Sequence, residues 1–504
     1  MFTSALEGLN LLLSIAWVVP LGVLAGMFVG AMPGLNASGM LAILLPVMVL
    51  LPPEVGLVLA VSLYAGGEVG NSFPSVVLNI PGDASAAVSA IEGYPMTLRG
   101  ESSKALGMCV MGSTVGAVFG GLCSLVAAPL LGGVALYFSY VEICIIILFG
   151  IVAIAQVSSG GVVRGLMVGF AGMLIATTGT DPMWGTFRGT FGSVYLLDGM
   201  PVVPALIGLL GISELFRMIE QGNMSTKVDP ALNRPVGLSG ILDGLWTTLR
   251  YPFDLLRASL TGMIVGIIPG TGGSVATFLS YQQALAWASP EDKKQFGKGS
   301  PRGLIAADTA NNACVGGSVV PLLTLGIPGS SSAAVLLVVM TYHGLEIGPR
   351  LMTLHGDIAY AIIWSQFIAA FFLLIMGSFL ALFAYRLAYI PVNTFIPVIV
   401  IAGLVGSFSQ NQYVFDMGLM LAFGVLGYFM KKFRYPVVAL LLGIVLGPTF
   451  EANLLRGLRL GFGSPELFFT RPIAQALWAL LALTIFGAPL LRLIRKYRTG
   501  KAAS

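Results

Sequence analysis

The stretch of sequence that decides the fold occurs twice. Residues 70–88 read GNSFPSVVLNIPGDASAAV and residues 317–335 read GSVVPLLTLGIPGSSSAAV, with ten of the nineteen aligned positions identical. A further Pro-Gly pair precedes each copy, in VGAMPG at 29–34 and in VGIIPG at 265–270. Proline lacks an N–H and clashes with the preceding helical turn, so each pair predicts the end of a helix inside apolar sequence. Repeated helix breaks of this kind are typical of secondary transporters, which bind substrate where broken helices meet.

The composition places the chain in a membrane. Hydrophobic residues make up 56% of the sequence and charged residues only 10%, whereas charged residues are about 25% of soluble domains. The mean hydropathy is +0.91. Apolar runs of about 20 residues predict an all-α polytopic membrane protein with about ten to fourteen transmembrane segments, some of them broken helices or re-entrant hairpins. We expect the first run, residues 9–32, to form one retained helix.

A polar interval divides the chain into two homologous halves. We expect a first transmembrane repeat at 1–216, a connecting loop at 217–257, a second repeat at 258–472, and a last helix with a basic tail at 473–504. An odd number of spans in each half would invert the second copy, as in many transporters, so we expect inverted repeats. Parallel repeats remain the alternative, because sequence identity does not distinguish the two.

Basic residues indicate which end of the chain faces the cytoplasm. They cluster between apolar runs at 431–434, which reads KKFR, and near the end at 492–498, which reads RLIRKYR. Loops rich in Lys and Arg stay on the cytoplasmic side of a membrane. We therefore expect a cytoplasmic C-terminus.

The breaks predict an anion site. A helix that starts inside the membrane points unpaired N–H groups and the positive end of its dipole into the break, which suits a carboxylate. Asp83 and Ser330 follow the breaks as N-cap residues. No Arg or Lys occurs in these segments, so backbone N–H and hydroxyl groups would hold the anion. A simple Pro-kinked helix is the alternative. The predicted substrate-binding residues are Pro33, Gly34, Asn36, Asn79, Pro81, Gly82, Asp83, Ser85, Pro269, Gly270, Thr271, Pro328, Gly329, Ser330, Ser331 and Ser332.

Acidic and amide side chains near the breaks predict a site for a coupling cation, Na⁺ or H⁺. A carboxylate at the bilayer centre costs about 2.5–3.5 kcal/mol, so its presence there favours a function. The predicted ion-coupling residues are Glu68, Asn71, Ser72, Asp308, Asn311 and Asn312. Hydrogen bonding between helices is the alternative role of the asparagines. Asp83 is expected mainly as a helix cap. Other acids near segment ends are expected to be solvated: Glu142, Asp181, Asp198 and Glu214.

Several catalytic motifs are absent from the sequence. It contains two histidines, and it has no HExxH, GxSxG or Walker A motif. The four cysteines have no CxxC spacing that would indicate a metal site. We expect a chain that is not an enzyme and needs no cofactor or metal beyond Na⁺. A channel-like or scaffold membrane subunit of an enzyme complex is the alternative to a transporter.

Three long motifs resemble the large membrane subunit of tripartite tricarboxylate transporters. They are GAMPGLNASGMLAILLP at 30–46, LNIPGDASAAVSAIEGYPMTLRGESSKALG at 78–107, and residues 303–351, which begin GLIAADTANNACVGGSVVP. The resemblance covers roughly residues 18–440. This chain departs from the family pattern in having Glu92 where the family favours Asp, Asn71 where it favours a second Gly, and ADTA at 307–310 where it favours a Pro-Glu pair.

The resemblance implies a bacterial inner-membrane symporter. Such proteins work with a small membrane subunit and a periplasmic solute-binding protein. They import a di- or tricarboxylate, driven by a Na⁺ or H⁺ gradient.

Overall fold

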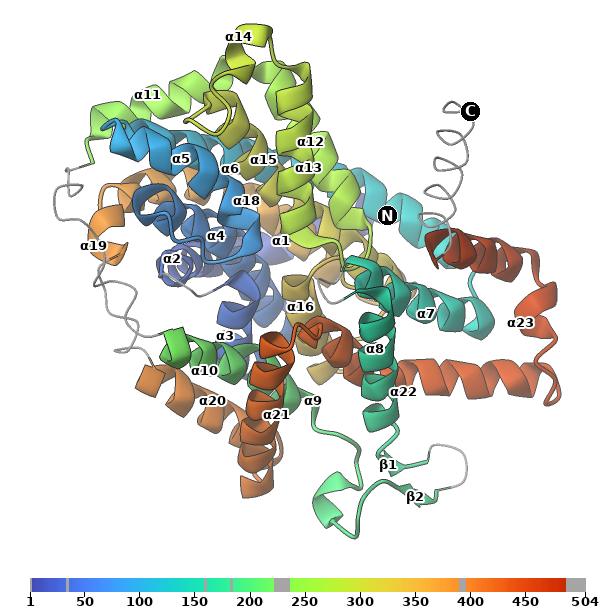
Figure 1. Cartoon of the computed structure of the whole chain (residues 1–504). Helices are drawn as coiled ribbons and strands as arrows, with labels where there is room; N and C mark the ends of the chain where they lie inside the picture. The colour runs from blue at the N-terminus through green and yellow to red at the C-terminus, as the bar shows by residue number, and fades with distance from the viewer. Residues whose placement is uncertain are drawn as a thin grey trace, which may run out of the picture. The chain divides into compact units, whose positions relative to one another are not determined.

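The computed structural model describes residues 2–32, 36–157, 161–181, 185–221, 236–388 and 396–485 (Figure 1). Pro33 and Gly34 of the first predicted break, and the basic residues 492–498, lie outside these ranges. The regular elements of the described chain are helices, apart from two strands of two residues each. The predicted all-α class is confirmed.

The elements of the N-terminal part are α1 (Phe2–Ser14), α2 (Val18–Gly30), α3 (Ala37–Leu50), α4 (Pro53–Leu78), η1 (Ala84–Ala86), α5 (Ala87–Leu98), α6 (Ser102–Ala135), α7 (Tyr140–Val157), α8 (Val162–Ala176), β1 (Gly179–Thr180), β2 (Phe187–Arg188), η2 (Val194–Leu196), α9 (Val202–Leu206), the π-helix η3 (Ile207–Ile212) and α10 (Ser213–Gln221). The C-terminal part contains α11 (Leu238–Leu249), α12 (Pro252–Ile267), α13 (Gly272–Trp287), α14 (Pro290–Lys293), α15 (Pro301–Leu325), α16 (Ser331–Tyr342), α17 (Leu351–Leu354), α18 (Gly356–Ala381), α19 (Ala384–Ala388), α20 (Ile396–Asn411), α21 (Val414–Lys432), α22 (Val437–Leu460), α23 (Leu467–Thr470) and a further helix, Pro472–Ile485.

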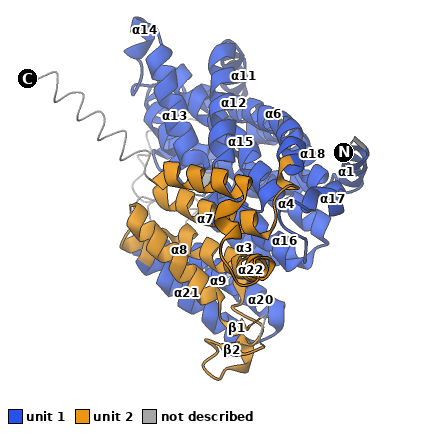
Figure 2. Ribbon diagram, turned by 90° about the vertical axis from the view of Figure 1, so that its right-hand side faces the viewer, with its two compact units in different colours: residues 1–133, 203–429 blue, residues 134–202, 430–504 orange. Residues whose placement is uncertain are grey.

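The chain divides into two compact units (Figure 2). Unit 1 contains residues 1–133 and 203–429, and unit 2 contains residues 134–202 and 430–504. Each unit therefore draws on both halves of the sequence. The predicted repeat boundaries do not coincide with these units and stay a prediction.

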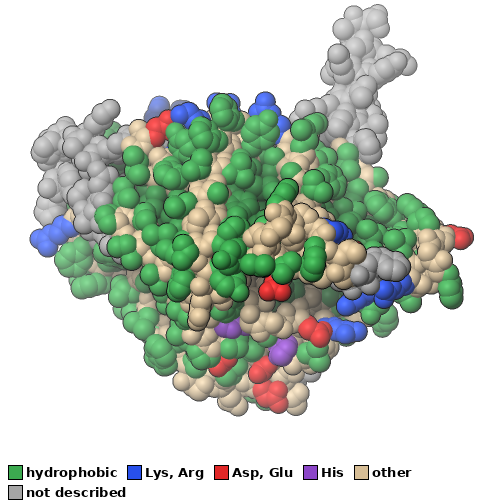
Figure 3. Space-filling view, turned by 90° about the horizontal axis from the view of Figure 1, so that it is seen from below, with side chains coloured by type: hydrophobic (Ala, Val, Ile, Leu, Met, Phe, Trp, Pro, Cys, Tyr) green, Lys and Arg blue, Asp and Glu red, His purple; other side chains and the backbone are tan. Residues whose placement is uncertain are grey.

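Five helical segments of the described chain are long and apolar enough to cross a membrane, namely α6, residues 202–220, α18, α21 and α22. The bent pair α1 and α2 makes a sixth if it counts as one span. Large hydrophobic side chains are exposed on the surface, as Figure 3 shows for one face. The chain is therefore a multi-pass membrane protein. The other apolar helices are shorter, so the count of about ten to fourteen segments stays a prediction.

The first apolar run does not form the single helix that the sequence predicts. Two helices, α1 and α2, meet there at an angle of 71°. Pro20 lies in the first turn of α2, where its ring would clash with the carbonyl of residue 16 in a continuous helix. The break in front of Pro20 removes this clash.

The duplicated sequence blocks form the same elements in both copies. In the first copy, α2 is followed by α3, and α4 is followed by η1 and α5; in the second, α12 is followed by α13, and α15 by α16. Helix α2 packs on α4, and α12 packs on α15. These shared contacts are what the predicted repeat requires, although the inverted relation between the copies stays a prediction.

Glycines bring the paired helices of each copy into close contact. A Cβ atom at Gly26 of α2 would lie 2.4 Å from the carbonyl oxygen of Leu63 on α4. At the corresponding position of the second copy, a Cβ atom at Gly262 of α12 would lie 2.2 Å from the carbonyl oxygen of Ala310 on α15. Small residues allow membrane helices to approach one another in this way. This close packing holds α4 and α15, which carry Glu68 and Asp308, in fixed positions.

Unit 2 is built around α22. Helices α7 and α8 pack on it, and a Cβ atom at Gly172 of α8 would lie 2.3 Å from the carbonyl oxygen of Leu440. Strands β1 and β2 pair antiparallel after α8, with Gly179 opposite Arg188. Arg188 ties this hairpin to Glu451 of α22.

Candidate functional site: the starts of broken helices in unit 1

Three helices of unit 1 start at one place. A Cβ atom at Gly272, the first residue of α13, would lie 3.8 Å from Cβ of Ser330, the N-cap of α16. A Cβ atom at Gly273 would lie 3.4 Å from Cβ of Ser85 in η1. The hydroxyl of Tyr64 on α4 lies 2.9 Å from that of Ser330. The site thus combines the start of η1 in the first copy with the starts of α13 and α16 in the second.

A buried glutamate lies beside these helix starts. Glu68 of α4 is 5% exposed, and its carboxylate accepts hydrogen bonds from Ser85 Oγ at 3.2 Å and from Asn311 Nδ2 at 3.0 Å. We call Glu68, Ser85 and Asn311 the Glu68 cluster. Its members come from α4, η1 and α15, so the cluster joins both copies of the duplicated sequence. The structure thus brings predicted ion-coupling and substrate-binding residues together.

A second buried carboxylate belongs to Asp308 of α15. Its Oδ1 accepts a hydrogen bond from Ser72 Oγ at 2.5 Å, and its Oδ2 accepts one from Ser89 Oγ at 3.1 Å. Ser72 lies on α4 and Ser89 on α5. Asp308 therefore links α15 to α4 and α5. The neighbouring element η1 contains Ser85, the serine that donates to Glu68.

Two buried amide oxygens on α15 have no hydrogen-bond partner among the described residues. They are the Oδ1 atoms of Asn311 and Asn312. Asn312 uses its Nδ2 to donate to the carbonyl oxygen of Ala65 at 3.3 Å, and Asn71 is buried on α4. An unpaired buried acceptor costs about 1–3 kcal/mol. Amide and carbonyl oxygens of this kind are ligands that transporters offer to Na⁺, so the residues fit a cation without any histidine or cysteine ligand.

The helix starts are capped by the residues that the sequence predicts. Ser330 Oγ accepts a hydrogen bond from the N–H of Ala333 at 3.1 Å, and Asp83 Oδ1 accepts one from the N–H of Ala84 at 2.5 Å. The predicted caps at Ser330 and Asp83 are confirmed. Asn36, which the sequence predicts as a substrate-binding residue, caps α3 by accepting from the N–H three residues later at 2.7 Å.

The two copies of the break differ in exposure. Helices α4 and α15 end at matching left-handed residues, Asn79 with φ of 58° and Gly326 with φ of 73°. Asn79 and Pro81 of the first copy are exposed, whereas residues 326–330 of the second copy are buried. The first copy of the break is therefore more exposed than the second.

Two predicted substrate-binding residues, Thr271 and Gly329, contact backbone carbonyl oxygens of α12. Thr271 Oγ1 donates to the carbonyl oxygens of Val265 and Ile268 at the end of α12. A Cβ atom at Gly329 would lie 2.2 Å from the carbonyl oxygen of Gly266, so Gly329 packs directly on α12. Of the rest, Gly82, Pro269, Pro328 and Ser332 are buried, whereas Gly270 and Ser331 are half-buried. Their contact with a substrate stays a prediction.

Two acids expected to be solvated are buried, so that expectation is wrong. Glu142 pairs with Arg471 at 2.8 Å within unit 2. Glu214, which is 1% exposed, pairs with Arg217 within unit 1. A buried carboxylate needs such a partner. The spacing of Glu214 and Arg217, three residues apart on one helix, is a sequence signal that predicts their ion pair. The partner of Glu142 is too distant in sequence for such a signal.

Sequence reasoning also missed the role of Glu92. This buried carboxylate on α5 accepts hydrogen bonds from Tyr281 OH at 2.8 Å and from the N–H groups of Gly297, Gly299 and Ser300 at 2.7, 2.9 and 2.7 Å. The middle of α5 is thereby fixed to α13 and to the polar loop between α13 and α15. The family motif indicated an acid here but not its partners.

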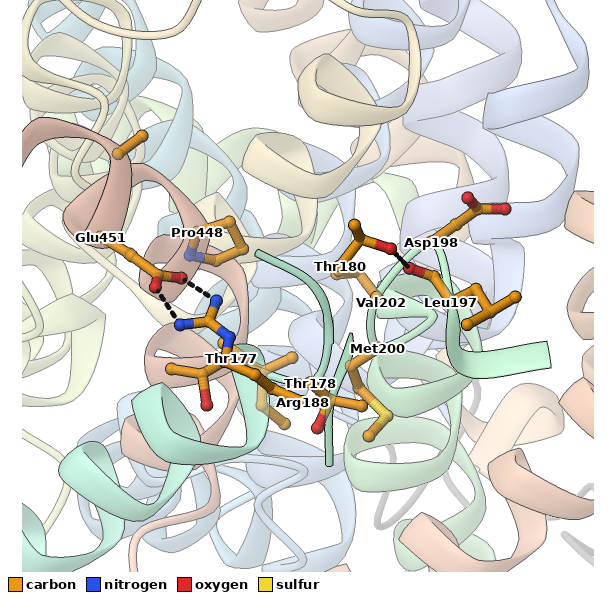
Figure 4. Close-up of a pocket in the computed structure, with 14 residues that line it drawn as sticks. Thr177, Thr178, Thr180, Arg188, Leu197, Asp198, Met200, Val202, Pro448 and Glu451 are labelled. Carbon is orange, nitrogen blue, oxygen red and sulfur yellow. Dashed lines mark hydrogen bonds and ion pairs between the residues drawn. The ribbon is translucent and has the colours of Figure 1, made fainter. Parts of the chain in front are cut away.

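A cavity of about 420 Å³ lies within unit 2 (Figure 4). Arg188 donates to both carboxylate oxygens of Glu451 there, at 2.6 and 3.0 Å, and Thr180 Oγ1 donates to the carbonyl oxygen of Leu197 at 2.8 Å. None of the predicted site residues lines this cavity. The predicted site residues that the structure describes all belong to unit 1, and their binding role stays a prediction.

Comparisons with known proteins identify the family of the chain. The family model described as "Tripartite tricarboxylate transporter TctA family" matches residues 16–442. An uncharacterized 52.8 kDa protein in the TAR-I ttuC' 3' region of Agrobacterium vitis is 31% identical over 482 residues, which cover 95% of this chain and 93% of the relative. A protein in the TAR-II ttuC' 3' region of the same organism is 33% identical over 219 residues, covering 44% of this chain and 90% of the relative. No solved structure matches. The chain, with its broken and capped helices, belongs to the TctA family of tripartite tricarboxylate transporters.

Proposed function

We propose that this chain is the large membrane subunit of a gradient-driven importer for a di- or tricarboxylate. It works in the bacterial inner membrane with a small membrane subunit, and it receives the solute from a periplasmic binding protein. Membership of the family supports this proposal. The observation that carries it is the meeting of η1, α13 and α16 beside the buried Glu68 cluster.

The helix starts supply the anion-binding part of this site. The first N–H groups of a helix have no partner within it, and the dipole places about half a positive charge at that end. Several such ends beside one another favour a carboxylate without a metal ion. The exposed first break at Asn79 and Pro81 gives solvent, and hence a solute, a way to reach this region.

The carboxylates of the site explain why an anion needs a coupling cation. Glu68 accepts a hydrogen bond from Ser85, two residues after Asp83, so both carboxylates lie near the start of η1. An anion about 8 Å from one ionised carboxylate is repelled by about 2 kcal/mol at an effective dielectric constant near 20. Na⁺ or H⁺ at the Glu68 cluster removes that repulsion. Anion binding and cation binding then favour each other, which is the thermodynamic basis of symport.

The orientation follows from the basic residues. Lys431 and Lys432 end α21, and Arg434 follows them. Under the positive-inside rule this end of α21 faces the cytoplasm. We place the C-terminal tail on the same side.

Uptake into cells that lack this gene, complemented with the wild-type chain, tests the proposal. Radiolabelled citrate and succinate should accumulate against their gradients. A sodium ionophore or a protonophore should abolish the accumulation, and the effective reagent identifies the cation. Glu68→Gln should reduce uptake at least tenfold with the chain still in the membrane, because it removes the charge that binds the cation. Glu7→Gln, at an exposed position on α1, is the matched control.

A channel-like or scaffold subunit is the other class of function. Such a chain cannot concentrate a solute. Uptake that only equilibrates, or that continues unchanged in Glu68→Gln, would contradict active transport through this site.

A further inference from the structure

We propose that the hairpin of α20 and α21 holds a binding site for one alkali-metal cation, formed by Ser407, Gln410 and Asp416. The site lies within unit 1 but shares no residue with the Glu68 cluster, and it goes beyond the proposed function. It follows from a buried carboxylate without a cationic partner, from two further buried oxygen atoms without a hydrogen bond, and from the register of the two helices.

Asp416 is a fully buried acid in the first turn of α21. Its Oδ2 accepts a hydrogen bond from Asn411 Nδ2 at 2.9 Å, whereas its Oδ1 is buried and has no hydrogen-bond partner among the described residues. None of the ion pairs between described residues involves Asp416. A carboxylate in such surroundings requires a cation or a proton to offset its charge.

Two residues of α20 present oxygen atoms in the same condition. Ser407 is fully buried, and neither its Oγ nor the buried Oε1 of Gln410 has a hydrogen-bond partner in the part of the chain that the structure describes. A buried serine in a helix often donates to the carbonyl oxygen four residues earlier, as Ser213 of α10 does to Leu209. Ser407 makes no such bond, so its hydroxyl oxygen is available to a ligand.

The register of the hairpin brings Ser407 opposite Asp416. Two residues separate the end of α20 from the start of α21, so the helices run in opposite directions from a short turn. A Cβ atom at Gly403 of α20 would lie 3.3 Å from Sδ of Met420 on α21. Ser407 lies one turn after Gly403, and Asp416 lies one turn before Met420. The two unpaired oxygen atoms therefore lie at the same level of the pair.

Gln410 and Asn411 extend the same side of α20. Residues three and four apart lie on one side of a helix, so both share the side of Ser407. The hydrogen bond from Asn411 to Asp416 shows that this side faces α21. The hairpin thus collects a carboxylate, an amide and a hydroxyl oxygen, all of them buried and unpaired among the described residues.

The ligand has to neutralise one negative charge and also contact several oxygen atoms. A proton on Asp416 neutralises the charge but satisfies only one further acceptor. A water molecule donates to two acceptors but carries no charge. A metal ion does both, because hard cations prefer carboxylate, carbonyl and similar oxygen ligands. A divalent ion would leave a buried positive charge, so the site fits a monovalent ion, which joins α20 to the start of α21.

Binding of radioactive Na⁺, and in a second arm of Rb⁺ as a substitute for K⁺, to the purified full chain in detergent tests the site. Asp416→Asn should remove one bound alkali ion per chain, because it removes the charge and keeps the size of the side chain. Ser407→Ala and Gln410→Met should each weaken binding of that ion about tenfold or more, since even outer contacts of a metal site contribute this much. Glu68→Gln should leave this ion bound.

Two variants are matched controls. Asp357→Asn removes a half-buried acid from the first turn of α18, and Ser213→Ala removes a buried serine whose hydroxyl donates to the backbone. Both should bind alkali ions like the wild type. A loss in Asp357→Asn equal to that in Asp416→Asn would mean that any acid at a helix start has this effect, and would overturn the site.

The number of bound ions decides the proposal. If Asp416→Asn binds as many alkali ions per chain as the wild type in both arms, the site is overturned. Wild-type affinity in both Ser407→Ala and Gln410→Met overturns it as well, and this arm suffices if Asp416→Asn does not fold. None of these measurements requires transport, so the proposed function fails separately, through the absence of solute accumulation.

Discussion

The substitution Gly273→Ala places a methyl group against the amide of the Glu68 cluster. The new Cβ atom would lie 2.3 Å from Asn311 Oδ1, and ordinary contact begins at 3.4 Å, so the amide must move by about 1 Å. The hydrogen bond from Asn311 Nδ2 to Glu68 is 3.0 Å long and breaks with that movement. A hydrogen bond to a charged group contributes about 1.5–3 kcal/mol. We therefore expect cation affinity to fall about tenfold to hundredfold.

The measurement is the concentration of coupling cation that gives half-maximal citrate uptake in complemented cells. Gly273→Ala should raise this concentration while citrate uptake at saturating cation stays within a few-fold of the wild type. Gly418→Ala is the matched control, because a Cβ atom at that helical position meets nothing within 4 Å. Alanine also favours the helix over glycine by about 1 kcal/mol, so the control should lose neither stability nor cation affinity.

An unchanged cation requirement in Gly273→Ala would refute the reasoning. It would mean that Asn311 and Glu68 can separate without cost to the cation site, and hence that the Glu68 cluster does not bind the coupling ion. A loss of uptake that no cation concentration restores would instead place Gly273 in the anion-binding part of the site.

Three further predictions concern other contacts. Glu92→Gln should lower the free energy of unfolding by about 2–3 kcal/mol, because an amide donor replaces an oxygen that accepts from backbone N–H groups; hydrogen exchange in the loop after α14 should rise. Ser89→Ala should leave one oxygen of Asp308 without its donor and reduce thermal stability by about 1–3 kcal/mol, and an unchanged melting temperature would contradict this contact. Glu451→Gln should weaken the anchor of Arg188 by about 1 kcal/mol, since the pair is partly exposed; faster exchange confined to the β1–β2 hairpin is the expected readout.

Composition and local sequence were enough to predict the class of the protein and the position of its breaks. Few charges and apolar runs of about 20 residues predict helices that span a membrane. The caps at Asp83 and Ser330 were predictable because a cap acts within three residues of itself along the chain. The prediction of one helix at 9–32 was wrong, because it relied on hydropathy and overlooked Pro20, which divides this apolar run into two helices.

The partners of the buried charges were not predictable in this way. Glu68 meets Ser85 17 residues away and Asn311 243 residues away. Glu142, predicted to be solvated, is buried against Arg471 from the other end of the chain. Such contacts depend on how closely helices approach, which is set by small residues on facing surfaces and leaves no signal at the charged residue itself.

The sequence by itself determined that this chain is a helical membrane protein of the TctA family, with helices that break at Pro-Gly pairs and restart at capping residues. Those properties depend on hydropathy and on contacts within a few residues. Only the tertiary structure decided which broken ends meet, and that Asn79 and Pro81 of the first copy are exposed while residues 326–330 of the second copy are buried. The physical reason is that a binding site formed by helix starts requires several distant helices to pack together, and their packing is decided by surfaces that no single stretch of sequence contains.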